Sequence, residues 1–253
     1  ETFAADLMKR GLVPLCGLDD ALTAIEAAAF LARPLSPEPI RVPQPVADPR
    51  LLSEHEAKAL LQKHGLKVPA STFAEGPEAA AQAAEDIGYP VVLKGTGIAH
   101  KTEAGAVALN LQSACEVHSA ASGMPASSFL VEEMITASLG ELLVGIVRDP
   151  AHGYVLTLAA GGILTELLED STSLIVPAGE DEIKKALENL KIGRVLTGYR
   201  GKPPCDLEAI VEAVQAVQSF VLSAPVEEVE INPLLCGADY AVAADALVRM
   251  GGN

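Results

Sequence analysis

Length, composition and charge exclude several classes of protein. The 253 residues are enough for one large domain or for two lobes with a sizeable core. Hydrophobic residues make up 49% of the chain, yet no run approaches the ~20 apolar residues that a membrane-spanning helix needs. The 18 Lys and Arg against 34 Asp and Glu give a formal net charge of −16, which disfavours nucleic acid and anionic membranes as partners.

The cysteines indicate a reducing compartment. They lie far apart and form no Cys-x-x-Cys pair, so neither a disulfide framework nor a zinc knuckle is expected. We therefore expect a cytoplasmic protein in which all four are buried as small hydrophobic residues: Cys16, Cys115, Cys205 and Cys236. The chain opens with ETFAADLMKRG, without an initiator Met or an apolar leader, which indicates a piece of a longer polypeptide.

The first 33 residues predict one strand, Leu12–Leu15, followed by one helix that Pro34 ends. Asp19 or Asp20 is expected to cap this helix. One strand and one helix cannot bury their apolar faces alone. We therefore interpret residues 1–33 as the C-terminal end of a preceding α/β domain. The apolar face of the helix would comprise Leu22, Ile25, Ala29 and Ala32.

Residues 34–50 predict a linker between domains. Six prolines fall between positions 34 and 49. Proline cannot continue a helix or donate to a sheet ladder, so such a segment is extended. A new domain is expected over residues 51–253.

This second domain is predicted to mix strands and helices. Ser53 and Glu56 form a capping box for a helix that stops at Gly65. The pattern of hairpins and helices indicates α+β lobes and not a doubly wound sheet. The other expected elements are strands at 66–70, 90–94, 107–111, 128–134, 141–148 and 154–159, helices at 77–87, 181–190 and 206–223, and a closing hairpin of 226–235 and 239–248 that turns at 236–238.

A lysine and a histidine are candidates for phosphate chemistry. Lys94 ends an apolar strand before a loop with glycines at 95, 97 and 105. Glycines let the backbone approach a phosphate, and the lysine supplies a positive charge. The spacing matches neither common phosphate-binding fingerprint, so an ordinary surface lysine is the alternative. His100 in the same loop is either a solvated side chain or a nucleophile that accepts a phosphoryl group.

Polar residues at strand ends form a second candidate group. Glu132, Glu133 and Met134 end one strand, and Glu141 begins the next. Carboxylates there can accept hydrogen bonds from ribose hydroxyls while backbone groups contact an adenine edge. Ordinary polar strand ends are the alternative.

The closing hairpin carries a candidate metal site. Glu230 and Asn232 end its first strand, and Asp245 lies on the second. Facing residues of an antiparallel pair share one side of the sheet, and Mg²⁺ prefers such oxygen ligands when it also holds phosphates. The residues alone leave a structural role equally open.

Two glycine-containing segments have two interpretations each. Gly161-Gly162, with Glu166 and Asp170 after it, is either a turn that needs positive φ or a phosphate-contacting loop. The segment 198–202 is the one basic cluster in the acidic second half, and it is either an anion contact or a turn before a helix.

In this order, the segments resemble the ATP-grasp domain of the ADP-forming acyl-CoA synthetases, relatives of succinyl-CoA synthetase. The resemblance covers residues 51–250 and rests on SEHEAKALLQKHGLKVP, YPVVLK, HKTEAGAV, FLVEEMI, GELLVGIVRDP, GGILTELLED, LTGYRGKPPCDLEAI and VEEVEINPL. It implies an ATP-grasp fold of two α+β lobes. Residues 1–33 would then be the end of the family's α/β, flavodoxin-like CoA-ligase domain.

The resemblance also implies an activity. The protein would be an acid–thiol ligase that interconverts acyl-CoA, ADP and phosphate with a carboxylic acid, CoA and ATP through phosphohistidine intermediates. Its partners would be the nucleotide and the CoA-binding and CoA-ligase domains, in the same longer protein or in a partner subunit. The full-length protein would be a homo-oligomer, and the cofactors would be ATP or ADP and Mg²⁺.

By the same resemblance, site residues have implied roles. His100 would carry the phosphoryl group, and Lys94 would hold nucleotide phosphates. Adenine and ribose would be held by Glu132, Glu133, Met134 and Glu141, and Mg²⁺ by Asn232, Asp245 and Glu230.

The chain departs from the family pattern at several positions. Glu103 and Ala106 replace an Asp and a Gly of the histidine loop, Leu174 stands where members commonly have Arg, and DPAHGY at 149–154 replaces DPxFGP. Two alternatives therefore stay open. One is a regulatory module without turnover, and the other is an ATP-grasp carboxylate–amine ligase, which needs no loop histidine.

Overall fold

The computed structural model describes residues 2–15, 17–32, 42–98, 104–162 and 170–251. The chain forms two units, Glu1–Pro39 and Ile40–Asn253, and the division falls inside the proline-rich segment 34–50. None of the described helices is long and apolar enough to cross a lipid bilayer.

The first unit consists of helices α1 (Thr2–Lys9) and α2 (Leu18–Leu31). The strand predicted at Leu12–Leu15 is wrong, because a strand needs a partner and the described part of this unit offers none. The predicted aspartate cap is also wrong. Gly17 is the N-cap of α2, and Asp19 and Asp20 lie in its first turn, where their charges suit the helix dipole.

Most of the large apolar side chains described in this first unit are exposed. Leu22 and Ile25, on the predicted apolar face of α2, are 57% and 58% exposed. Helix α1 buries no residue either. The assignment of residues 1–33 to the end of a CoA-ligase domain stays a prediction.

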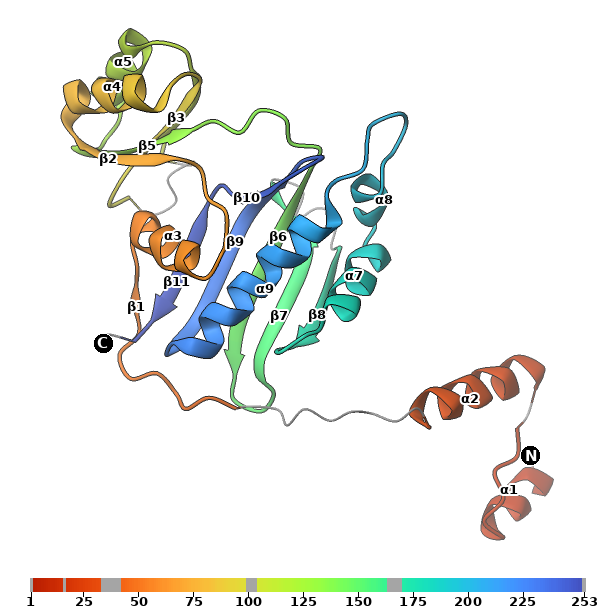
Figure 1. The fold of residues 1–253 in the computed structure, drawn as a ribbon. Helices are drawn as coiled ribbons and strands as arrows, with labels where there is room; N and C mark the ends of the chain where they lie inside the picture. Colours follow the sequence, from red (N-terminus) through yellow and green to blue (C-terminus); the bar gives the residue numbers. More distant parts are fainter. Residues whose placement is uncertain (1, 16, 33–41, 99–103, 163–169, 252–253) are drawn as a thin grey trace. The chain divides into compact units, whose positions relative to one another are not determined.

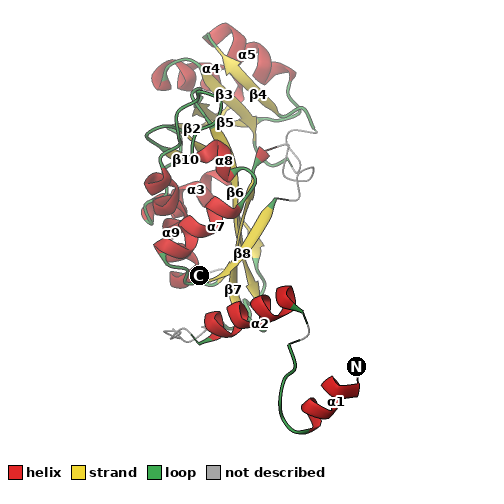
Figure 2. Ribbon diagram, turned by 90° about the vertical axis from the view of Figure 1, so that its right-hand side faces the viewer, coloured by secondary structure: helices red, strands yellow, loops and turns green. Residues whose placement is uncertain are grey.

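The second unit contains a large antiparallel sheet in the order β1-β11-β9-β6-β7-β8, with β10 also paired to β9. Helices α3 (Glu54–Lys63), α7 (Glu180–Asn189) and α9 (Leu207–Ser223) gather on one side of it, and the short α8 spans Gly193–Leu196 (Figures 1 and 2). The strands are β1 (Arg50–Leu51), β6 (Gly140–Asp149), β7 (Gly153–Ala160), β8 (Ser171–Ile175), β9 (Val226–Cys236), β10 (Ala241–Ala243) and β11 (Ala246–Met250).

The same unit contains a smaller antiparallel sheet in the order β2-β5-β3-β4. Helices α4 (Gly76–Ile87) and α5 (Ala114–Gly123) lie against it (Figure 1). Its strands are β2 (Ser71–Glu75), β3 (Val91–Gly95), β4 (Val107–Leu111) and β5 (Ser128–Glu133).

Strand alternation gives this small sheet two different faces. Leu93 is paired with Val131, and both belong to the apolar core that packs on α4 and α5. The neighbouring pair, Val92 and Glu132, points to the other face, as does Lys94. All five residues of β3 are buried, so Lys94 is a charge carried by a strand that is covered on both sides.

The predicted α+β lobes are confirmed, with corrections to individual elements. The capping box of Ser53 and Glu56 forms as predicted. The strand predicted at 66–70 lies instead at 71–75, and α5, α8 and β8 were not predicted. The second arm of the closing hairpin is split into β10 and β11, and Ala244 and Asp245 lie in the break.

Candidate functional site

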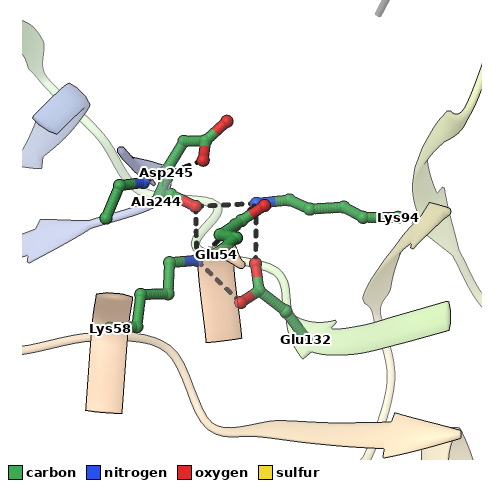
Figure 3. A network of polar contacts seen from close by, with 7 residues as sticks. Glu54, Lys58, Lys94, Glu132, Ala244 and Asp245 are labelled. Atoms are coloured by element: carbon green, nitrogen blue, oxygen red, sulfur yellow. Dashed lines mark hydrogen bonds and ion pairs between the residues drawn. The ribbon is translucent and has the colours of Figure 1, made fainter. Parts of the chain in front are cut away.

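Four buried charged side chains meet where α3, the small sheet and the β10–β11 break come together (Figure 3). Helix α3 supplies two of them, and β3 and β5 supply one each. Two are negative and two positive, so the cluster is balanced in charge. Their relative exposures are 8% for Glu54, 2% for Lys58, 8% for Lys94 and 2% for Glu132.

Local sequence explains how α3 presents its two charges. The capping box starts the helix at Ser53, which places Glu54 in the first turn, where a carboxylate is favoured by the helix dipole. Lys58 follows one turn later on the same side. Ala57 and Leu61 are fully buried in the core of the large lobe and hold this side of the helix inward.

The two ammonium groups share one set of acceptors. Lys94 Nζ lies 2.6 Å from Glu54 Oε1, 2.8 Å from Glu132 Oε2 and 2.7 Å from the Ala244 carbonyl. Lys58 Nζ lies 2.8 Å from Glu54 Oε1, 2.7 Å from Glu132 Oε1 and 2.6 Å from the same carbonyl. Each ammonium has three hydrogens and three oxygen partners here, two of them held by hydrogen bonds and one by an ion pair.

The electrostatics of the cluster keep Lys94 charged. Burial alone would lower the pKa of Lys94, but the carboxylates of Glu132, Glu54 and Asp245 outweigh it and raise the pKa above its ordinary value. Lys94 is therefore a protonated, positive group at neutral pH.

The predicted metal residues lie beside this cluster, at the break in the closing hairpin. Strand register pairs Ala246 with Ile231 and Ala243 with Leu234, so Asp245 and Asn232 stand opposite each other. Glu230 lies two residues before Asn232 and points to the same side of β9. Asp245 is close enough to Lys94 to influence its pKa.

This group offers oxygen ligands of the kind that Mg²⁺ takes. Asp245 and Glu230 provide carboxylates and Asn232 an amide oxygen. No group of three His, Cys, Asp or Glu side chains that could hold a metal is found among the described residues. Such a partial set suits Mg²⁺, which commonly takes its other ligands from water and substrate phosphates.

The Gly161-Gly162 segment connects Asn232 to Glu141. The amide of Gly162 donates to Asn232 Oδ1 at 3.0 Å, and the amide of Gly161 donates to the Glu141 carbonyl at 2.8 Å. Gly162 has φ +69°, and any side chain there would meet the Glu141 carboxylate. The positive-φ interpretation of this segment is therefore confirmed at Gly162.

The other predicted nucleotide-binding residues are less buried than the charged cluster, or they lie outside the described residues. Glu133 is exposed, and its amide donates to the Ala70 carbonyl at 2.8 Å. Met134 is half-buried, and its amide donates to the Pro90 carbonyl at 3.1 Å. His100 and Glu103 lie outside the described residues, as does Glu166.

Other polar segments lie elsewhere. Asp170 accepts from the amides of Lys191 and Ile192 at 2.8 and 2.9 Å, which is a structural role. The basic segment 198–202 borders a surface pocket of about 210 Å³, in which the Arg200 guanidinium lies 5.2 Å from the Tyr199 ring centroid. This pocket is lined by Leu139, Val195, Tyr199, Arg200, Lys202 and Pro203, none of them in the charged cluster.

Two residues of the cluster, Glu54 and Lys58, were not predicted. Their signal was present, because they share a helical side with Leu61, which the sequence places on the apolar stripe. Charges on such a stripe indicate partners inside the protein. Their partners Lys94 and Glu132 are 36 to 78 positions away, and no local pattern identifies them.

Comparison with known proteins places this fold in a family. Residues 46–250 match the ATP-grasp domain. The chain is 33% identical to the acetate–CoA ligase [ADP-forming] II subunit beta of Pyrococcus furiosus, over 79% of this chain and 91% of that protein. It is 31% identical to acetate–CoA ligase [ADP-forming] II of Archaeoglobus fulgidus, over 79% of this chain and 30% of that longer protein.

Solved structures agree. The dinucleotide-forming acetyl-coenzyme A synthetase 1 of Ca. Korarchaeum cryptofilum, bound to coenzyme A and Ca-AMPCP, has a TM-score of 0.73 and 27% identity, covering 90% of this chain and 98% of that one. Another complex of that protein, with coenzyme A and Mg-AMPPCP, has its phosphohistidine segment pointing towards the nucleotide binding site, with a TM-score of 0.68, 28% identity, and coverage of 79% and 92%.

The chain belongs to the ATP-grasp domain family. Within that family, the two relatives compared above are ADP-forming acetate–CoA ligases, and the chain is the ATP-grasp component of an acid–thiol ligase of this kind. The resemblance inferred from the sequence motifs is therefore confirmed.

Proposed function

We propose that this chain binds ATP or ADP with Mg²⁺ and carries the nucleotide end of a phosphoryl relay between acyl-CoA and nucleotide. One observation carries the proposal. Lys94, a buried and protonated lysine at the end of β3, lies beside the strand break that holds Asp245 opposite Asn232. A cation and a set of oxygen ligands side by side suit a Mg²⁺-bound polyphosphate.

The chemistry assigned to these residues is electrostatic. The Lys94 ammonium would hold the nucleotide phosphates and offset negative charge on the phosphoryl group during transfer. Asn232, Asp245 and Glu230 would hold Mg²⁺, whose positive charge would offset the negative charge of the phosphates. Gly162, fixed to Asn232 by its amide, would keep that side chain oriented.

The base and ribose would lie toward the segment that joins β5 to β6. Glu141 at the start of β6 is exposed, and its carboxylate is available to ribose hydroxyls. Glu133 and Met134 would flank the adenine. Glu132 is placed differently from what the motif implies, because both of its carboxylate oxygens contact lysines and it is 2% exposed. We assign it to holding Lys94.

The relay itself would use His100. Phosphate displaces CoA from the acyl-CoA to give an acyl phosphate, whose phosphoryl group passes to a histidine as the carboxylate leaves. His100 would then take the phosphoryl group and transfer it to the terminal phosphate of ADP, which gives ATP. The acyl phosphate and the first histidine belong to CoA-binding and CoA-ligase domains, in the same longer protein or in a partner subunit. We place the reaction in the cytoplasm and expect a homo-oligomer of the complete assembly.

Two of the family departures, Leu174 and Ala106, do not belong to the charged cluster. Leu174 pairs with Leu156 and packs against the apolar core of the large lobe, and Ala106 is fully buried. The alternative of a carboxylate–amine ligase is separated by His100→Ala in the complete assembly. That variant abolishes phosphoryl transfer in a relay enzyme and leaves a carboxylate–amine ligase active.

Calorimetric titration of the chain with ADP and with ATP tests the proposal. We expect saturable binding in Mg²⁺ that weakens when the metal is removed by EDTA. In Asn232→Ala the dependence on Mg²⁺ should largely disappear, because a metal ligand is lost. A matched control is Asn189→Ala, at the end of α7. Absence of binding at millimolar nucleotide by a folded sample would contradict the proposal and favour the regulatory alternative.

A further inference from the structure

We propose that Lys58 is a positioning residue, which holds Glu54, Glu132 and the Ala244 carbonyl so that Lys94 can turn from them to the nucleotide phosphates. The inference rests on the proposed function of the same site. It assigns a role to a lysine that no sequence motif identified as functional.

The three hydrogens of the Lys94 ammonium limit how many acceptors it can contact at once. The ammonium has three oxygen partners: it donates hydrogen bonds to Glu54 and to the Ala244 carbonyl, and it forms an ion pair with Glu132. Lys94 can therefore contact a phosphate only by releasing at least one of these acceptors. A buried acceptor that loses its donor is costly, most of all when it carries a charge.

Lys58 removes that cost. Each group that Lys94 would release is also held by Lys58: Glu54 at 2.8 Å, Glu132 at 2.7 Å and the Ala244 carbonyl at 2.6 Å. Figure 3 shows the two lysines approaching this carbonyl from different elements. When Lys94 leaves, both carboxylates and the carbonyl keep Lys58 as a cationic partner.

The hydrogen bonds alone do not say which lysine leaves, but the surroundings do. Lys58 stands on α3 next to the fully buried Ala57, and its side chain is 3% exposed. The Lys94 side chain is 10% exposed and lies near the end of β3. It is also close enough to Asp245, in the predicted metal group, for that carboxylate to raise its pKa. Lys94 is therefore the mobile partner and Lys58 the fixed one.

The net charge left in the cluster predicts that Lys58→Met weakens nucleotide binding and that Glu54→Gln tightens it. With Lys94 turned away, the cluster carries one net negative charge in the wild type. In Lys58→Met it would carry two, so Lys94 is held back and nucleotide binding weakens. The double variant Lys58→Met/Glu54→Gln restores the wild-type count. Glu54→Gln alone leaves Lys94 less restrained, so nucleotide binding tightens.

The experiment is a calorimetric titration of the full chain with ADP in Mg²⁺, with each variant's thermal midpoint measured alongside. We expect Lys58→Met to weaken ADP by about tenfold or more, and the double variant to return to within about threefold of wild type. Glu54→Gln should bind several-fold tighter. The matched control is Lys184→Met, which removes the lysine of a surface pair with Glu208 and should not change affinity.

The outcomes separate this inference from the proposed function. No binding by folded wild-type chain overturns both. Binding by wild type with unchanged affinity in folded Lys58→Met, or a double variant no better than the single one, overturns the role of Lys58 alone. A merely structural role predicts that Glu54→Gln weakens binding, so this variant decides the matter even where Lys58→Met does not fold.

Discussion

The two faces of the small sheet are built from the same strands and do opposite things. One face carries Leu93, Phe129 and Val131 against α4 and α5, in a core made largely of alanine and valine. The other face carries Lys94 and Glu132 against α3 and the β10–β11 break. In the central strands β3 and β5 both faces are covered, but buried charged side chains lie on the second face alone among the described residues.

The difference shows how one lobe can combine an apolar core with a buried cluster of charged side chains. The apolar face holds the strands in place through packing that tolerates no charge. The charged face is covered by α3 of the large lobe. That helix supplies one carboxylate and one ammonium, which balance the ammonium and the carboxylate of the small sheet. Because successive side chains of a strand point to opposite faces, a substitution on one face need not disturb the side chains of the other.

The largest expected effect comes from breaking the apolar face. Phe129→Ala should lower the free energy of unfolding by about 3–5 kcal/mol, because Phe129 is fully buried and its removal leaves a cavity. Denaturant unfolding measures this loss. The control is Phe73→Ala on the opposite face of the same sheet, where the side chain is 47% exposed and the loss should stay within about 1 kcal/mol. Equal losses would contradict the assignment of the core to one face.

A smaller effect is expected from the charged face, and on binding. Lys94→Met should weaken ADP and ATP by about tenfold to a hundredfold, the usual range for losing one hydrogen bond to a charged group. Calorimetric titration in Mg²⁺ measures this. Lys185→Met, which removes an exposed lysine from α7, is the matched control and should bind normally. Normal affinity in Lys94→Met would remove this lysine from the phosphate site.

The smallest effect compares the helix caps behind the two faces. Ser53→Ala at the start of α3 and Ser113→Ala at the start of α5 should each cost about 1 kcal/mol of stability, since each removes a side-chain cap. Only Ser53→Ala should also weaken nucleotide binding, because α3 presents Glu54 and Lys58. Equal effects of both variants on binding would contradict this separation.

The pH dependence of Ser53→Ala follows from the capping box. Hydrogen bonds from the backbone and side chain of Ser53 hold the pKa of Glu56 below its ordinary value. A carboxyl group with a lowered folded pKa contributes stability above its unfolded pKa, and this is lost as the pH falls through the folded value. The stability gap between wild type and Ser53→Ala should therefore narrow in acid, as followed by thermal unfolding between pH 7 and pH 3.

Local patterns predicted much of the second unit. The capping box at Ser53, the helix that ends before Gly88 and the buried strand that ends in Lys94 all depend on residues within a few positions of one another. The predicted metal residues could also be proposed locally, because the hairpin register sets Asn232 opposite Asp245.

Features that depend on distant partners were missed. The strand predicted at Leu12–Leu15 has suitable residues but nothing to pair with in the described part of its unit. The charged cluster joins Lys58 to Glu132 across 74 positions and Glu54 to Lys94 across 40, and hydrophobic periodicity carries no information about such pairings. The role of Glu132 in holding Lys94 became visible only in three dimensions.

The pairing of β1 with β11 has a consequence for how the domain can be joined to other domains of a larger protein. Arg50 is paired with Met250 and Leu51 with Arg249, so the backbone enters and leaves the ATP-grasp domain through adjacent strands of one sheet edge. A domain whose entrance and exit adjoin can be moved between polypeptides as a cassette, with little disturbance to its interior. Among its relatives the domain occurs both as a separate subunit and as a segment of a longer chain. Adjacent entry and exit strands suit both arrangements.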